Sequence, residues 1–205
     1  MAEFIRIYEE NPNPKEIKKV VKILRDGGVI IYPSDTVYAL GCDIKNTRAM
    51  ERVAQLRSVK LEKANFSFVC EDLSNLSDYV KQIDTPTFKL LKRNLPGPYT
   101  FILPGNNNLP SVFKKKKEVG IRVPDNSITR AIVQELGNPI ISTSIKDEDE
   151  VIEYTTDPEL ILEKWDHLVD AVIDGGYGGN VPSTVIDLTG PEPVVVREGK
   201  GSLEL

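Results

Sequence analysis

Apolar residues recur every three or four positions in the segment that follows Asn13, which is the spacing of an amphipathic helix. Asn13 has a side chain that can cap a helix, and Pro14 suits the first helical position. Gly27 and Gly28 end the pattern, because glycine readily adopts the backbone conformations that terminate helices. The sequence therefore predicts a helix from Pro14 to these glycines, with its apolar face at Ile17, Val20, Val21 and Leu24.

Short apolar runs alternate with further helical patterns along the rest of the chain. Polar stretches separate them, among them a lysine-bearing loop at 58–65 and an acidic loop at 146–153. Further helices are predicted at 47–57, at 73–80, from Thr85 to the turn at Pro96, from a capping Ser127 to Gly137, and from Asp157 onward. The predicted strands are 29–32, 36–42, 66–70, 99–103, 119–123, 139–144, 168–173, 184–188 and 194–197.

This alternation predicts the fold class: a three-layer α/β domain with helices on both faces of a twisted β-sheet. The connections at Pro33 and from Leu188 to Val194 are too short for a helical crossover, so the strands that they join should be antiparallel. A mixed sheet is therefore expected. The chain shows no internal repeat or linker, and we interpret residues 1–205 as one domain.

Composition narrows the classes of function. The net charge is -5, which argues against nucleic-acid binding through overall charge and leaves any basic face local. No apolar run approaches the roughly 18 residues that span a bilayer, and with no signal pattern we expect a cytoplasmic protein without a membrane partner. Cys42 and Cys70 lack the spacing of a metal site or disulfide framework, and the one histidine, His167, excludes most histidine-based catalysis.

Hydroxyl and basic side chains gather where predicted strands run into turns, which is where ligands bind in α/β sheets. Three adjacent hydroxyls end one strand, at Ser142, Thr143 and Ser144. These hydroxyls can bind a phosphate or a carboxylate, or they can equally form the hydrogen bonds of a turn. Arg122 lies inside a strand, where it either grips an anion or faces solvent.

Other charged residues allow more ordinary interpretations. Arg57 can interact with the C-terminus of its helix, and Arg197 can be an edge-strand charge. We interpret the run Lys114–Lys117 as a solvated loop. Asp35, Asp43 and Asp187 are separate in the sequence and are sufficiently explained as turn or capping residues. No catalytic acid, base or nucleophile and no metal-ligating set is apparent.

Five short motifs occur in order across nearly the whole chain. They are 32–41 (YPSDTVYALG), 96–100 (PGPYT), 121–124 (IRVP), 142–144 (STS) and 182–187 (PSTVID), followed by 196–199 (VREG). Together these segments resemble the YrdC family, and the resemblance is closest to the YciO branch, through Asn65-Phe66, Asn94 and the glycines at 175–176. The resemblance implies a twisted mixed sheet around a concave cavity lined with positive charge.

The family resemblance implies a nucleotidyltransferase that makes threonylcarbamoyl-AMP from L-threonine, bicarbonate and ATP for adenosine-37 modification of tRNA. Magnesium would accompany the ATP. The alternatives are a double-stranded RNA-binding protein and a nucleotide-binding regulatory paralogue without turnover. By the same resemblance, threonine would be held by Ser34, Arg122, Ser142 and Ser183, and the nucleotide by Arg57, Ser144 and Arg197.

The chain departs from the family pattern at two positions. Gln55 stands where the family's KxR pattern has lysine, and Lys146 stands where its SxN pattern has asparagine. Lys60 and Lys63, in the loop after Arg57, are therefore candidates to return positive charge to the nucleotide phosphates, as is Lys146. Because of these two departures, the alternative of a regulatory paralogue without turnover stays open.

Overall fold

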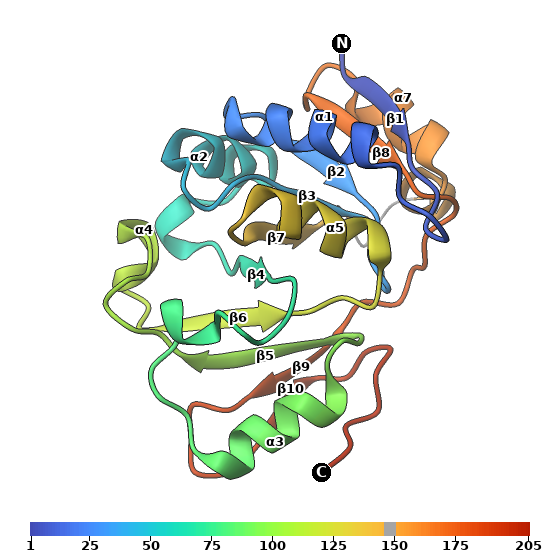
Figure 1. The fold of residues 1–205 in the computed structure, drawn as a ribbon. Coiled ribbons are helices and arrows are strands. Elements are labelled where there is room, and N and C mark those ends of the chain that lie inside the picture. The colour runs from blue at the N-terminus through green and yellow to red at the C-terminus, as the bar shows by residue number, and fades with distance from the viewer. Residues whose placement is uncertain (146–150) are drawn as a thin grey trace.

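The computed structural model describes residues 1–145 and 151–205, and within these its strands form one mixed sheet (Figure 1). The strand order is β1-β8-β2-β3-β7-β4-β6-β5-β9-β10. The strands are β1 (Glu3–Arg6), β2 (Ile30–Tyr32), β3 (Ala39–Gly41), β4 (Ser67–Val69), β5 (Tyr99–Pro104), β6 (Glu118–Arg122), β7 (Ile140–Ser144), β8 (Ala171–Asp174), β9 (Thr184–Asp187) and β10 (Val194–Arg197).

The helices begin and end close to the predicted signals. The side chain of Asn13 accepts a hydrogen bond from the Lys15 amide, so the predicted cap of the first helix is confirmed. The helices are α1 (Pro14–Arg25), α2 (Thr47–Leu56), α3 (Thr85–Asn94), α4 (Ser111–Lys114), α5 (Ser127–Leu136), α6 (Glu153–Thr156) and α7 (Pro158–Trp165), with short 3₁₀ turns η1 (Leu61–Lys63) and η2 (Leu76–Asp78).

Successive residues of the central strands pack into two separate hydrophobic cores, one on each face of the sheet. In β2, Ile30 and Tyr32 join the core under α1 and α5, whereas Ile31 joins the core under α2, α3 and α7. The same alternation separates Ile140 from Ile141 in β7. Because side chains alternate across a strand, this pattern places helices on both faces and confirms the predicted three-layer α/β fold.

The pairing of the strands is mixed, as predicted. The short connection at Pro33 joins β2 and β3 as antiparallel neighbours, and the connection after Leu188 joins β9 and β10 in the same way. In contrast, β8 lies parallel to both β1 and β2, and β4 lies parallel to β6. Helices or long loops connect these parallel strands, which is the geometric requirement for such pairs.

Several local predictions were wrong. The strand β1 was missed because it is only four residues long and lies at the edge of the sheet, with one buried side chain. The helix expected at 73–80 contains only the turn η2, and α4 occupies part of an expected loop. Asn126, not Ser127, caps α5 by accepting from the Thr129 amide, while the Ser127 hydroxyl donates to the Glu9 carbonyl.

The acidic loop predicted at 146–153 lies largely outside the described residues, and its last residue, Glu153, begins α6. Across the part of the chain that the structure describes, every helix is too short or too polar to cross a bilayer.

The C-terminal tail, residues 198–205, folds back along β9 and α3. The Thr184 hydroxyl donates to the Gly201 carbonyl and accepts from the amides of Gly199 and Gly201. Farther along, Asn94 exchanges two hydrogen bonds with the backbone of Glu204. These contacts fix the chain on both sides of Lys200, whose ammonium donates to the Asp35 carbonyl at 2.6 Å. The tail therefore connects β9 to the loop between β2 and β3.

Candidate functional site

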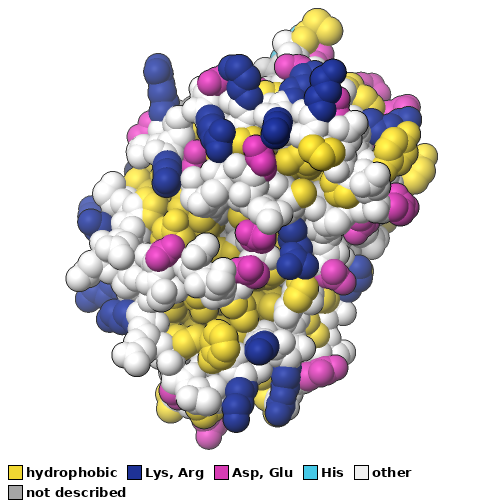
Figure 2. Space-filling view, in the orientation of Figure 1, with side chains coloured by type: hydrophobic (Ala, Val, Ile, Leu, Met, Phe, Trp, Pro, Cys, Tyr) yellow, Lys and Arg dark blue, Asp and Glu magenta, His cyan; other side chains and the backbone are white. Residues whose placement is uncertain are grey.

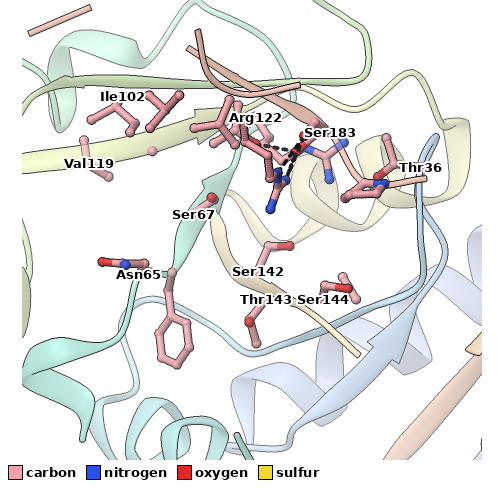
Figure 3. Close-up of a pocket in the computed structure, with 18 of the residues that line it drawn as sticks. Thr36, Asn65, Ser67, Ile102, Val119, Arg122, Ser142, Thr143, Ser144 and Ser183 are labelled. Atoms are coloured by element: carbon pink, nitrogen blue, oxygen red, sulfur yellow. Dashed lines mark hydrogen bonds between the residues drawn. The ribbon is translucent and has the colours of Figure 1, made fainter. Parts of the chain in front are cut away.

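A cavity of about 460 Å³ lies against the half of the sheet formed by β7, β4, β6, β5 and β9 (Figure 3). The loop between β2 and β3 and the end of β10 complete its wall. Basic side chains in the lining come from Arg57, Lys116, Arg122 and Arg197, and its one carboxylate among the described residues is Glu118. The hydroxyls are those of Thr36, Ser67, Thr100, Ser142, Thr143, Ser144 and Ser183.

Arg122, at the end of β6, is held by Asp35 from the loop between β2 and β3. Its Nη2 atom donates to Asp35 Oδ1 at 2.8 Å, and the two side chains are only 7% and 8% exposed. The other carboxylate oxygen of Asp35 accepts from the Asp125 amide at 2.9 Å. Within the described residues the buried Nε of Arg122 has no hydrogen-bond partner. A buried donor without an acceptor is costly, so an acceptor on a ligand would stabilise it.

Ser183 connects a second arginine to the same site. Arg197, at the end of β10, donates from Nη2 to the Ser183 carbonyl at 2.7 Å. The Ser183 hydroxyl in turn shares a 2.8 Å hydrogen bond with the hydroxyl of Thr100 on β5. Among the described residues, therefore, the Arg197 guanidinium donates to neutral oxygen atoms of Ser183.

The two guanidinium groups repel each other. Burial lowers the pKa of Arg197, and the nearby charge of Arg122 lowers this pKa further. Both effects disfavour the charged form of the side chain, and among the described residues only Arg122 of this pair has a carboxylate partner. The arrangement thus favours the binding of an anionic ligand. Such a ligand would offset the free-energy cost of burying the Arg197 charge, and it would also accept a hydrogen bond from Nε of Arg122.

The hydroxyl-bearing residues of β7, Ser142, Thr143 and Ser144, lie across the cavity from Arg122 (Figure 3). Ser142 is buried and lies near the phenol of Tyr32 in the neighbouring core. Burial raises the pKa of Tyr32 to about 12, and Ser142 and Arg122 partly oppose that rise. Tyr32 therefore remains neutral at physiological pH. Ser142, Thr143 and Ser144 supply neutral donors and acceptors that can bind an anion without a proton transfer.

The structure brings six of the nine predicted site residues into this cavity. They are Arg57, Arg122, Ser142, Ser144, Ser183 and Arg197. Ser34 does not line it: its hydroxyl donates to the Val37 carbonyl at 2.6 Å and bonds to the hydroxyl of Thr36, which does line the cavity. Lys60 and Lys63 are exposed at η1 and outside the lining, and Lys146 lies outside the described residues.

Sequence reasoning missed four residues of the site. Thr36 and Thr100 belong to segments that resemble the YrdC family, so their motifs gave the signal. Asp35 was interpreted as a turn residue, although it lies beside Thr36 in the first of these segments. Lys116 was assigned to a solvated run of lysines, and no local pattern distinguishes it from its neighbours.

The comparison with protein families matches the Sua5/YciO/YrdC model, described as telomere recombination, over residues 22–199. The crystal structure of Escherichia coli YciO is similar, with 44% identity and a TM-score of 0.90, and the match covers 100% of this chain and 98% of that chain.

More distant relatives carry functional names. The threonylcarbamoyl-AMP synthase of Bacillus subtilis is 29% identical over 200 residues, which cover 96% of this chain and 57% of that protein. The crystal structure of P. abyssi Sua5 complexed with L-threonine is 27% identical, with a TM-score of 0.84, and the match covers 96% of this chain and 57% of that chain. The chain thus spans somewhat more than half the length of these two relatives.

Proposed function

The chain belongs to the Sua5/YciO/YrdC family, and on this premise we propose that it binds L-threonine and ATP in the cavity and forms threonylcarbamoyl-AMP. A relative that binds L-threonine and one named as a threonylcarbamoyl-AMP synthase support the proposal. The product would serve adenosine-37 modification of tRNA.

One observation carries the proposal: the buried Nε of Arg122 has no partner in the described residues, although the guanidinium is otherwise fixed by Asp35. A carboxylate is a strong acceptor for this donor. Arg122 would therefore bind the carboxylate of threonine, with the hydroxyls of Ser142 and Ser183 beside it. Thr36, held by Ser34, would be a further neutral contact.

The reaction needs little proton transfer from the protein. The amine of threonine forms a C–N bond with bicarbonate, water leaves, and an oxygen of the resulting carbamate attacks the α-phosphorus of ATP. The bond from that phosphorus to the oxygen that bridges the α- and β-phosphates breaks, and this oxygen leaves with pyrophosphate. Positive charge around the phosphates is the main catalytic requirement. Arg57 and Arg197, with Ser144, would supply this positive charge and a neutral hydroxyl.

Magnesium would enter with the nucleotide. Glu118 is the one carboxylate among the described residues that line the cavity, and the described residues contain no group of three metal-ligating side chains. The residues present do not fit a protein-built magnesium site. Magnesium prefers phosphate oxygens and water, so the cavity would receive it already bound to the triphosphate.

The alternative of double-stranded RNA binding gains no support from the surface in Figure 2. Lysine and arginine side chains on this face are interspersed with acidic ones, over α1 at the top and α3 at the bottom. Binding to the phosphate backbone is strongest where basic side chains form a continuous face. The described side chains on this view provide no such face.

Pyrophosphate release from ATP, measured with L-threonine and bicarbonate present and with each omitted in turn, tests the proposal. We expect release that requires both co-substrates and that falls roughly ten- to a hundred-fold in R122M, since a charged hydrogen bond contributes about 1.5 to 3 kcal/mol. The matched control is R6M, which changes an arginine remote from the cavity lining. Pyrophosphate release independent of threonine would contradict the proposal, and ATP binding without release would favour the regulatory paralogue.

A further inference from the structure

Lys116 is the one residue of the four-lysine run 114–117 that lines the cavity. Its ammonium donates to the Ala64 carbonyl and, at 3.2 Å, to Oδ1 of Asn65. The side chain is half-buried, whereas Lys114, Lys115 and Lys117 are exposed. The ammonium is therefore turned toward the segment between η1 and β4 and away from solvent.

Lys116 lies at the end of the cavity away from the arginine pair. Its partner Asn65 is on the opposite side of the cavity from Arg122, Ser183 and Thr36, with Ser67 and Ser142 between them (Figure 3). Lys116 lies two residues before the start of β6, and Arg122 ends this strand. At a rise of about 3.3 Å per residue, β6 separates the Cα atoms of Glu118 and Arg122 by about 13 Å. The cavity is thus long, with positive charge at both ends.

The surroundings of Lys116 leave its charge uncompensated. Burial lowers the pKa of Lys116, and Glu118 opposes this change without forming an ion pair with it in the described residues. The two atoms that contact the ammonium are neutral acceptors. A partly desolvated cation held only by neutral groups is stabilised by an anion, and its free donors can reach one.

Two other lysines considered for this charge, Lys60 and Lys63, do not line the cavity. Gln55 replaces the lysine of the family pattern and is exposed, and Lys60 and Lys63 are exposed and absent from the lining. Lys116 comes from the segment between α4 and β6, so the tertiary structure places a basic side chain in the cavity that does not come from the loop after Arg57.

We propose that Lys116 binds the β- and γ-phosphates of the nucleotide, so that the ligand lies along β6 with its carboxylate at Arg122 and its pyrophosphate group at Lys116. The orientation of the ligand rests on the proposed function, whereas polyphosphate binding by Lys116 does not. Arg197, beside Arg122, then lies nearer the α-phosphate, where the new bond forms. Lys116 is thereby a substrate-contacting residue that stabilises the leaving pyrophosphate.

Titration calorimetry with inorganic pyrophosphate, ATP and AMP tests this assignment at fixed ionic strength. In K116M we expect the affinity for pyrophosphate and ATP to fall roughly ten- to a hundred-fold, and the affinity for AMP to change less than about two-fold. K116R should retain most of the affinity because it keeps the charge. The matched controls K114M and K115M remove neighbouring exposed lysines and should bind pyrophosphate as the wild type does.

The outcomes separate this inference from the proposed function. Equal pyrophosphate affinity in K116M and wild type would overturn the role of Lys116, while threonine-dependent pyrophosphate release would still support the synthase proposal. A second outcome combines two results: of the lysine variants only K116M loses affinity for pyrophosphate, and the wild type does not bind L-threonine. This outcome would support the role of Lys116 and contradict the synthase proposal. Equal losses in K114M, K115M and K116M would indicate a diffuse charge effect and overturn the assignment, as would a wild type that binds no pyrophosphate. Melting temperatures show whether K116M and K116R are folded.

Discussion

Arg122 and Asp35 form a buried ion pair between β6 and the loop that joins β2 to β3, with Nη2 and Oδ1 2.8 Å apart. The pair fixes the guanidinium at one end of the cavity without using all of its donors, since Nε has no partner in the described residues. Asp35 also accepts from the Asp125 amide, and its carbonyl accepts from Lys200. One aspartate therefore joins three segments that surround the candidate binding site.

Replacement of Asp35 by alanine leaves Arg122 buried without its counter-ion. Removal of one partner of a buried ion pair typically costs about 3 to 5 kcal/mol, and we expect D35A to lower the free energy of unfolding by that amount. Urea denaturation provides the measurement. The double variant D35A/R122M should be less destabilised than the sum of the single variants, because it contains no unpaired charge.

A matched control for D35A is D187A, because the Asp187 carboxylate accepts hydrogen bonds from its neighbour Thr189 in a local turn and from no other group among the described residues. We expect this variant to lose about 1 kcal/mol or less. A loss in D35A no larger than that in D187A would contradict the structural importance of the Arg122–Asp35 pair.

Arg197 should contribute more to the binding of an anionic ligand than to the stability of the fold. Burial and the charge of Arg122 disfavour its charged form, and its hydrogen bonds to Ser183 offset part of that cost. We expect R197M to change the free energy of unfolding by less than about 1 kcal/mol while weakening AMP binding roughly ten- to a hundred-fold. Calorimetry and urea denaturation on the same sample give both numbers. A large stability loss with unchanged affinity would show that Arg197 is structural.

Thr184 anchors the C-terminal tail through a buried hydroxyl that makes three hydrogen bonds to the tail backbone. T184V keeps the shape of the side chain and removes these bonds, and it should cost about 1 to 3 kcal/mol because tail groups lose their partners. We expect the tail to be digested faster by carboxypeptidase, as mass spectrometry would show. T189V, which removes an exposed hydroxyl next to Asp187, is the control, and equal digestion of both variants would contradict the anchoring role.

The two cysteines should be unreactive in the folded protein. Burial raises the pKa of Cys70 to about 12 and that of Cys42 further. At pH 8 the thiolate fraction of Cys70 is then roughly one in ten thousand, and the thiolate is the reactive form. Absorbance with Ellman's reagent should show slow reaction in native buffer and rapid reaction of both thiols in urea. Rapid reaction of either thiol in native buffer would contradict the burial of that side chain.

The sequence determined those features that depend on residues close together in the chain. Apolar spacing and the cap at Asn13 located α1, and short connections indicated which neighbouring strands are antiparallel. The motif that contains Arg122 and those with Ser142 and Ser183 supplied four of the six predicted site residues that line the cavity. These signals are local, because hydrogen bonding in a helix cap and the geometry of a turn involve only a few consecutive residues.

Only the tertiary structure decided which charged groups meet. Asp35 and Arg122 are 87 residues apart in sequence, so a turn residue and a strand arginine became a buried pair only when β6 and the loop after β2 were brought together. Within the run 114–117, the sequence treats four lysines alike, yet the path of the chain into β6 directs Lys116 toward Asn65 and leaves its neighbours in solvent. Composition fixes how many charges exist, and the packing of distant segments determines which of them lose water and so become able to bind a ligand.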